Sequence, residues 1–84
     1  MSNRQSYSYS EAIDDLEIFI NKYVQDQKSK DELLEYLALC RTNKTVTFRY
    51  IHEEIMNYRK KFSDYREFTD SEMKMIEDLM HFWG

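Results

Sequence analysis

The residues best suited to metal chemistry in this chain are its two histidines, His52 and His81. His52 opens the run His-Glu-Glu-Ile-Met, which begins like a helical zinc-protease motif. That motif needs a second histidine four residues later so that both imidazoles reach one metal, and Met56 stands there instead. A carboxylate-bridged di-metal bundle needs a Glu-x-x-His pair on each of two helices, and only His81, with Glu77 before it, approximates one. We therefore expect no metal site.

Composition also argues against cofactor binding and catalysis. The single glycine is Gly84 and proline is absent, whereas phosphate-cradling loops need internal glycines so that backbone N–H groups can approach the anion. Acidic pairs such as Glu53 and Glu54 are adjacent in sequence, so on a helix their side chains diverge. The serines fall where helix caps or turns explain them. We expect no cofactor and no enzymatic activity.

Basic side chains gather in the middle of the chain and suggest nucleic-acid binding as one alternative. The net charge is −4, yet residues 41–66 carry 7 basic and 3 acidic side chains. The segment 33–61 predicts helix, short loop, helix, which is the outline of a helix-turn-helix. Its second helix carries the basic residues Arg49, Arg59, Lys60 and Lys61. Acidic residues in the middle of that helix and the negative charge of the whole chain weaken this alternative, because both repel phosphate.

The aromatic content favours a protein partner. The chain has 7 tyrosines, 5 phenylalanines and 1 tryptophan, and Tyr and Trp are enriched in protein interfaces. Those outside the expected buried stripes either cover a thin core or form a contact surface; they are Tyr7, Tyr9, Tyr36, Tyr65 and Trp83. The first candidate surface combines acidic helix faces with one tyrosine: Asp14, Asp15, Glu17, Asp31, Glu32, Glu35 and Tyr36. A second candidate lies on the last helix, at Met75 and Trp83, and is suited to homodimer formation.

Four amphipathic helices must position these residues. The clearest is 47–62, around which we expect the rest to be arranged, because its apolar residues follow steps of 3, 4, 3 and 4: Phe48, Ile51, Ile55, Tyr58 and Phe62. Three capping-box spacings mark helix starts, at Ser8–Glu11, Ser29–Glu32 and Thr69–Glu72. The prediction is an all-α fold, a compact bundle of four helices at about 9–25, 30–41, 47–62 and 70–82, with short loops.

Two local questions stay open in the sequence. Residues 45–50 alternate between apolar and polar, which also fits a strand, although no other segment alternates as a partner. The last helix carries two adjacent apolar stripes. We expect Met73 and Met80 to face the core and Met75 or Met56 to face solvent.

The chain as a whole predicts one small domain, 7–84, after a frayed N-terminus, 1–6. No apolar run approaches the roughly 20 residues that span a bilayer, and the first residues lack the apolar core of a signal peptide. With its single cysteine, Cys40, the protein is expected to be cytoplasmic. The favoured function is a non-catalytic regulator, inhibitor or immunity-type factor of bacterial or phage type, which occludes a basic or apolar site on a partner protein. The alternative is a DNA-binding transcriptional regulator.

Overall fold

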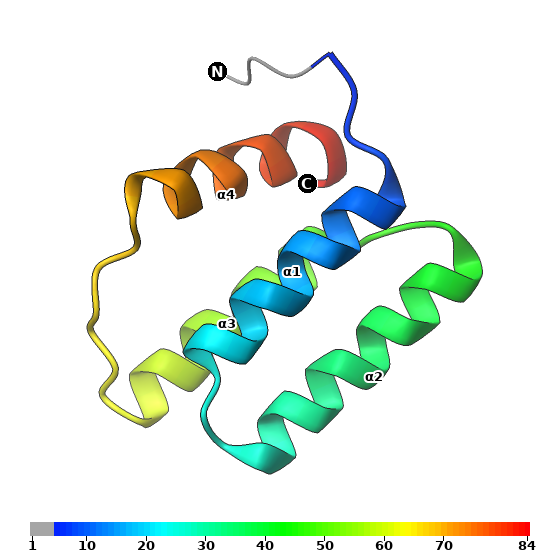
Figure 1. The fold of residues 1–84 in the computed structure, drawn as a ribbon. Coiled ribbons are helices and arrows are strands. Elements are labelled where there is room, and N and C mark those ends of the chain that lie inside the picture. The colour runs from blue at the N-terminus through cyan, green and yellow to red at the C-terminus, as the bar shows by residue number, and fades with distance from the viewer. Residues whose placement is uncertain (1–4) are drawn as a thin grey trace.

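A computed structural model describes residues 5–84 of the chain, which form four helices. They are α1 (Tyr9–Tyr23), α2 (Gln27–Asn43), α3 (Phe48–Lys61) and α4 (Asp70–Trp83). Helices α1 and α2 run antiparallel side by side, α3 lies behind α1, and α4 crosses above them (Figure 1). No strand occurs within the described residues, so the predicted all-α bundle is confirmed. Of the predicted frayed segment, residues 1–4 lie outside the described part, and residues 5 and 6 are exposed.

Helix starts follow local capping chemistry. The Ser8 hydroxyl accepts a hydrogen bond from the Glu11 N–H at 3.1 Å, and Thr69 caps α4 in the same way. The predicted capping box at Ser29 is wrong, because α2 begins three residues earlier. There the Asp26 carboxylate accepts the Ser29 N–H at 3.0 Å. Asp26 precedes Ser29 in the chain and caps equally well, so it sets the start.

Two helices end without a glycine by placing another residue in the left-handed region. Lys44 after α2 has φ 55°, and Ser63 after α3 has φ 54°. At the first of these ends the Thr45 N–H donates to the Cys40 carbonyl at 3.1 Å, which satisfies one of the last helical carbonyls. The chain then runs irregularly to α3, so the ambiguous segment 45–50 is helical from Phe48 onward.

The core is built chiefly on α1, which contributes more buried apolar residues than any other helix: Ala12, Ile13, Leu16, Phe19, Ile20 and Tyr23. Our expectation that 47–62 is the organising helix is therefore wrong. Helix α3 buries four of its five stripe residues, but the fifth, Phe62, is 47% exposed at the helix end. Helix α2 adds Leu33, Leu37 and Cys40.

Helix α4 is rotated relative to the prediction. Leu79 is fully buried and Met75 packs against the core, whereas Met73 and Met80 are 51% and 46% exposed. Polar contacts explain this rotation of α4. Glu72 lies on the same helix face as Leu79, and it accepts hydrogen bonds from the Lys22 ammonium at 2.8 Å and from the Tyr23 hydroxyl. These bonds hold the stripe that contains Met75 and Leu79 against α1, so the stripe that contains Met73 and Met80 faces outward.

The last turn of α4 packs against the N-terminal segment at Tyr7. The Trp83 indole N–H donates to the Tyr7 carbonyl at 2.8 Å, and the Tyr7 ring meets the Phe82 ring edge-on at 6.2 Å between centroids. Tyr7 is buried, so two of the surplus aromatics belong to the fold. Tyr65, by contrast, is 75% exposed.

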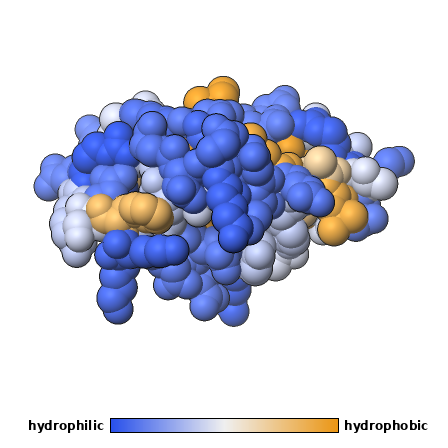
Figure 2. Space-filling model, turned by 90° about the horizontal axis from the view of Figure 1, so that it is seen from below, coloured by the Kyte–Doolittle hydropathy of each residue, from blue (hydrophilic) through white to orange (hydrophobic). Residues whose placement is uncertain are grey.

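Seen from below, the surface is mostly hydrophilic, with small hydrophobic patches that are separate from one another (Figure 2). None of the helices in the described part of the chain has both the length and the apolar character to cross a membrane.

Candidate protein-interaction surface

The acidic residues predicted on α1 are held by the fold itself. The Arg41 guanidinium of α2 donates to Asp14 at 2.8 Å and to Glu17 at 3.2 Å. Asp15 points elsewhere and accepts the Tyr7 hydroxyl at 2.5 Å. These three carboxylates therefore tie α1 to α2 and to the N-terminal segment, and they do not form one surface with the acids of α2.

The acidic residues of α2 lie differently. Asp31 is exposed and accepts a hydrogen bond from Gln27 on its own helix at 2.7 Å. Glu32 and Glu35 flank Tyr36 along a shallow groove that also includes Ala38, Leu39 and Thr42. Of the predicted residues, the structure thus brings together Glu32, Glu35 and Tyr36.

Helix α3 completes this surface. The Tyr36 ring packs against the Tyr50 ring at 4.6 Å between centroids. Burial raises the pKa of Tyr36 above its ordinary value, so its hydroxyl stays neutral at physiological pH. Leu39 and Tyr50 are 56% and 45% exposed. We name this surface the α2–α3 face and define it by Glu32, Glu35, Tyr36, Leu39, Tyr50 and Glu54.

A cavity of about 190 Å³ opens beside the tyrosine pair, between α2 and α3. Glu32 lines both this cavity and the shallow groove, so the two hollows adjoin. Within residues 5–84, no hydrogen bond or ion pair engages the side chains of Glu32, Glu35 or Glu54. The α2–α3 face thus offers unpaired carboxylates next to exposed aromatic and aliphatic carbon, a combination that is complementary to cationic and apolar groups.

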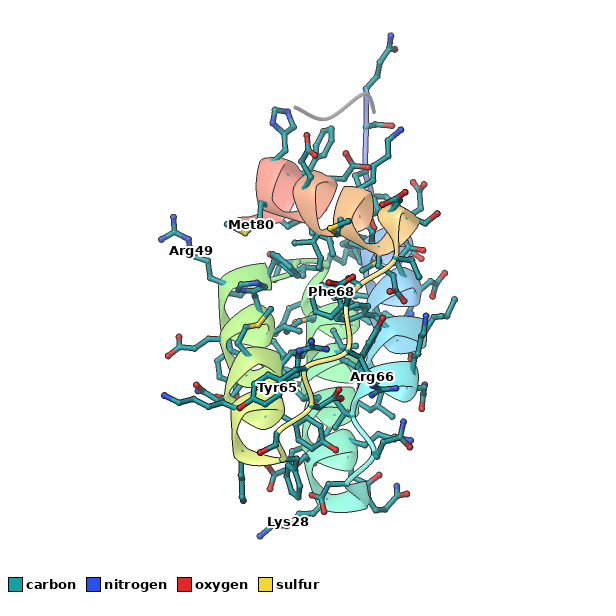
Figure 3. All side chains as sticks on the ribbon, turned by 90° about the vertical axis from the view of Figure 1, so that its left-hand side faces the viewer. Lys28, Arg49, Tyr65, Arg66, Phe68 and Met80 are labelled. Carbon is teal, nitrogen blue, oxygen red and sulfur yellow. The ribbon has the colours of Figure 1, made fainter. Side chains whose placement is uncertain are left out.

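The second predicted surface, on α4, is not assembled. Met75 packs on the core, and the Trp83 indole is hydrogen-bonded to the Tyr7 carbonyl. The methionines that α4 exposes are Met73 and Met80. Met80 projects beside the start of α3, on the same side as Arg49, and away from the α3–α4 connection (Figure 3).

Three of the four basic residues proposed for nucleic-acid binding border three different hollows. Arg49 lies in the groove with Trp83, Lys61 lines the α2–α3 cavity, and Arg59 borders the groove beside Tyr65. Arg49 points away from the body of the protein (Figure 3). Lys60 is exposed.

Arg59 has a structural role. Its guanidinium lies 4.5 Å from the Phe68 ring centre and donates to the Arg66 carbonyl. Arg66 in turn donates to Asp64, and this ion pair lowers the Asp64 pKa to about 2. Together they hold the α3–α4 connection against Tyr23, so Arg59 is not available as part of a basic stripe on α3.

No group of three potential metal ligands occurs in the part of the chain that the structure describes. The ring of His52 packs beside Phe48 and that of His81 beside Phe82. Cys40 is buried among apolar residues.

Sequence reasoning missed Leu39, Tyr50 and Glu54. One signal for the first was present, because Leu39 falls three residues after Tyr36 and four after Glu35 and so shares their helix face. No sequence signal placed Tyr50 against Tyr36, since that contact depends on how α3 packs on α2.

Comparison of the chain with protein-family models, with curated proteins and with solved structures found no match in any of the three.

Proposed function

We propose that this protein is a non-catalytic protein-interaction module that acts as a regulator, inhibitor or immunity-type factor of bacterial or phage type. It binds a partner protein through the α2–α3 face and occludes a basic or apolar functional site on that partner. We place this activity in the cytoplasm, where the buried Cys40 thiol stays reduced.

The observation that carries the proposal is the contrast between two sets of carboxylates. Asp14 and Glu17 of α1 are paired with Arg41, whereas Glu32, Glu35 and Glu54 have no partner among the described residues. Unpaired charges speed association with an oppositely charged site, and the tyrosines and Leu39 supply contact area at low cost in conformational entropy. A face built this way suits reversible docking to a partner protein.

Affinity capture with matched bait variants tests the proposal. Leu39→Ser on the α2–α3 face is paired with Ile18→Ser, which alters a 71% exposed aliphatic residue of α1. Glu54→Lys is paired with Glu53→Lys, the neighbouring exposed acid that does not line the cavity. We expect the wild type, Ile18→Ser and Glu53→Lys to retain the same protein, and the other two variants to lose it with helicity unchanged.

Two results would contradict the proposal. One is equal retention of the partner by all baits. The other is recovery of nucleic acid in place of protein, in a salt-sensitive manner that Lys60→Glu and Lys61→Glu abolish. Light scattering on the wild type tests whether the protein forms a homodimer, whose contact would lie on the exposed Met73 and Met80 of α4. A dimer that persists in Leu39→Ser would assign the main interaction surface to α4.

A further inference from the structure

The α2–α3 cavity has a lining that selects its occupant. Its volume of about 190 Å³ equals roughly six waters at liquid density, which is room for one long side chain. Leu33 and Tyr58, which are 6% and 8% exposed, form the apolar wall of the cavity. Glu32 from α2 and Glu54 from α3 each add an acidic residue to the lining of the cavity.

The charge of the cavity favours a cation. Among its described lining residues, Lys61 is the one cation, and its ammonium lies 5.5 Å from the Phe62 ring centre. It makes no ion pair with Glu32 or Glu54. Glu32 and Glu54 carry like charge and line the same cavity, so a cation bound there is attracted to both.

We propose that this cavity binds an arginine side chain of the partner protein, with its guanidinium shared between Glu32 and Glu54 and its face against Tyr50. The inference rests on the proposed function and names the partner's chemistry. The apolar wall accommodates the aliphatic stem, while Ser29 and Asn57 supply further acceptors for N–H groups. The apolar residue that accompanies this arginine lies in the adjoining groove on Leu39.

Arginine fits better than lysine for three physical reasons. Its planar guanidinium donates to two carboxylates at once, it stacks on an aromatic ring, and it sheds its water more readily than an ammonium group. A lysine would satisfy one carboxylate and remain strongly hydrated. The cavity should therefore discriminate between the two cations.

The test is titration of the ¹⁵N-labelled full chain with N-acetyl-arginine amide, N-acetyl-lysine amide and N-acetyl-citrulline amide, followed by amide chemical shifts. We expect saturable shifts at Ser29, Leu33 and Asn57 with arginine, with a dissociation constant on the order of 1 mM, which is typical of a ligand this small. Lysine should bind several-fold more weakly. The neutral citrulline probe should cause no saturable shift.

Matched variants locate the charge requirement. Glu54→Gln and Glu32→Gln should each weaken arginine binding about tenfold, the value of a charge-assisted hydrogen bond. Glu53→Gln, one residue away on another face of α3, should leave it unchanged. Binding that persists in the double variant Glu32→Gln/Glu54→Gln, equal shifts with citrulline, or no shift with arginine would overturn the inference. Concentration-dependent shifts at these amides without any probe would assign the cavity to a second copy and overturn it as well.

The two proposals fail separately. If a partner is captured in a Leu39-dependent manner but arginine amide does not bind, the interaction function stands and the arginine cavity does not. If arginine amide binds but Leu39→Ser and Glu54→Lys retain every captured protein, the cavity stands and the docking function does not.

Discussion

The indole N–H of Trp83 donates a hydrogen bond to the backbone carbonyl of Tyr7 at 2.8 Å, across 76 residues of sequence. This bond joins the last turn of α4 to the segment that precedes α1. It is supported by the edge-on contact between Tyr7 and Phe82 and by the bond from the Tyr7 hydroxyl to Asp15. Trp83 is therefore a structural residue of the fold.

Trp83→Phe should lower the free energy of unfolding by about 1 kcal/mol, because it keeps an aromatic ring but removes the donor to a partly buried carbonyl. Urea unfolding followed by far-ultraviolet circular dichroism measures the change. Tyr65→Phe, at a 75% exposed position, serves as the control and should alter stability by less than about 0.5 kcal/mol. Equal stability of all three proteins would show that the bond does not form in solution.

Glu72 should make the fold sensitive to acid. Burial alone would raise its pKa, but hydrogen bonds from Lys22, Tyr23 and the Thr69 N–H lower that pKa from 4.5 to about 2. Since the folded-state pKa lies below the unfolded value, the stabilisation is present above about pH 4.5 and is lost as pH falls toward 2.

Unfolding free energies measured across that pH range check this prediction. Glu72→Gln should be less stable at neutral pH and should lose less stability on acidification than the wild type. It should keep some acid dependence, because the pKa of Asp64 is also lowered to about 2. The exposed Glu67→Gln should follow the wild-type curve; a wild-type slope in Glu72→Gln would contradict the assignment.

The rotation of α4 predicts opposite responses at two adjacent residues. Leu79→Ala should cost about 2 to 5 kcal/mol, because Leu79 is fully buried and truncation leaves a cavity. Met80→Ala should cost under about 1 kcal/mol, since Met80 is 46% exposed. Denaturant unfolding of both variants decides the matter. A larger loss of unfolding free energy in Met80→Ala than in Leu79→Ala would mean that the stripe with Met73 and Met80 faces the core.

Lys44, at the end of α2, is a position where a substitution should stabilise the fold. Lys44 has φ 55°, where an L side chain crowds the following carbonyl and glycine does not, so Lys44→Gly should raise the unfolding free energy by about 0.5 to 1 kcal/mol. Ala38→Gly, an exposed position inside α2, should instead lower it by about 1 kcal/mol. Melting temperatures of the two variants should move in opposite directions, and a shared direction would argue against the left-handed cap.

The number and approximate bounds of the helices were predictable because their causes are local. Apolar steps of three and four and the capping boxes at Ser8 and Thr69 act within a few residues of the chain. The start of α2 was predicted wrongly for a reason of the same kind, since Asp26 and Ser29 both cap well and the sequence does not say which one does.

The candidate surface was predictable only in part. Glu32, Glu35 and Tyr36 share one helix face, and the sequence periodicity shows this directly. Whether an acidic side chain is available to a partner depends on the neighbouring helix: Arg41 reaches Asp14 and Glu17, and no cation reaches Glu32 or Glu54 among the described residues.

By itself, then, the sequence determined four amphipathic helices, the capping boxes of α1 and α4, and the absence of recognisable motifs for metal or phosphate chemistry. The tertiary structure decided which stripe of α4 faces inward, which carboxylates are paired, and that Tyr50 and Glu54 join Tyr36 in one surface. The physical reason is range. Helix formation and capping depend on neighbours three or four residues away, whereas pairing of charges and matching of faces depend on packing between helices that lie far apart in the chain.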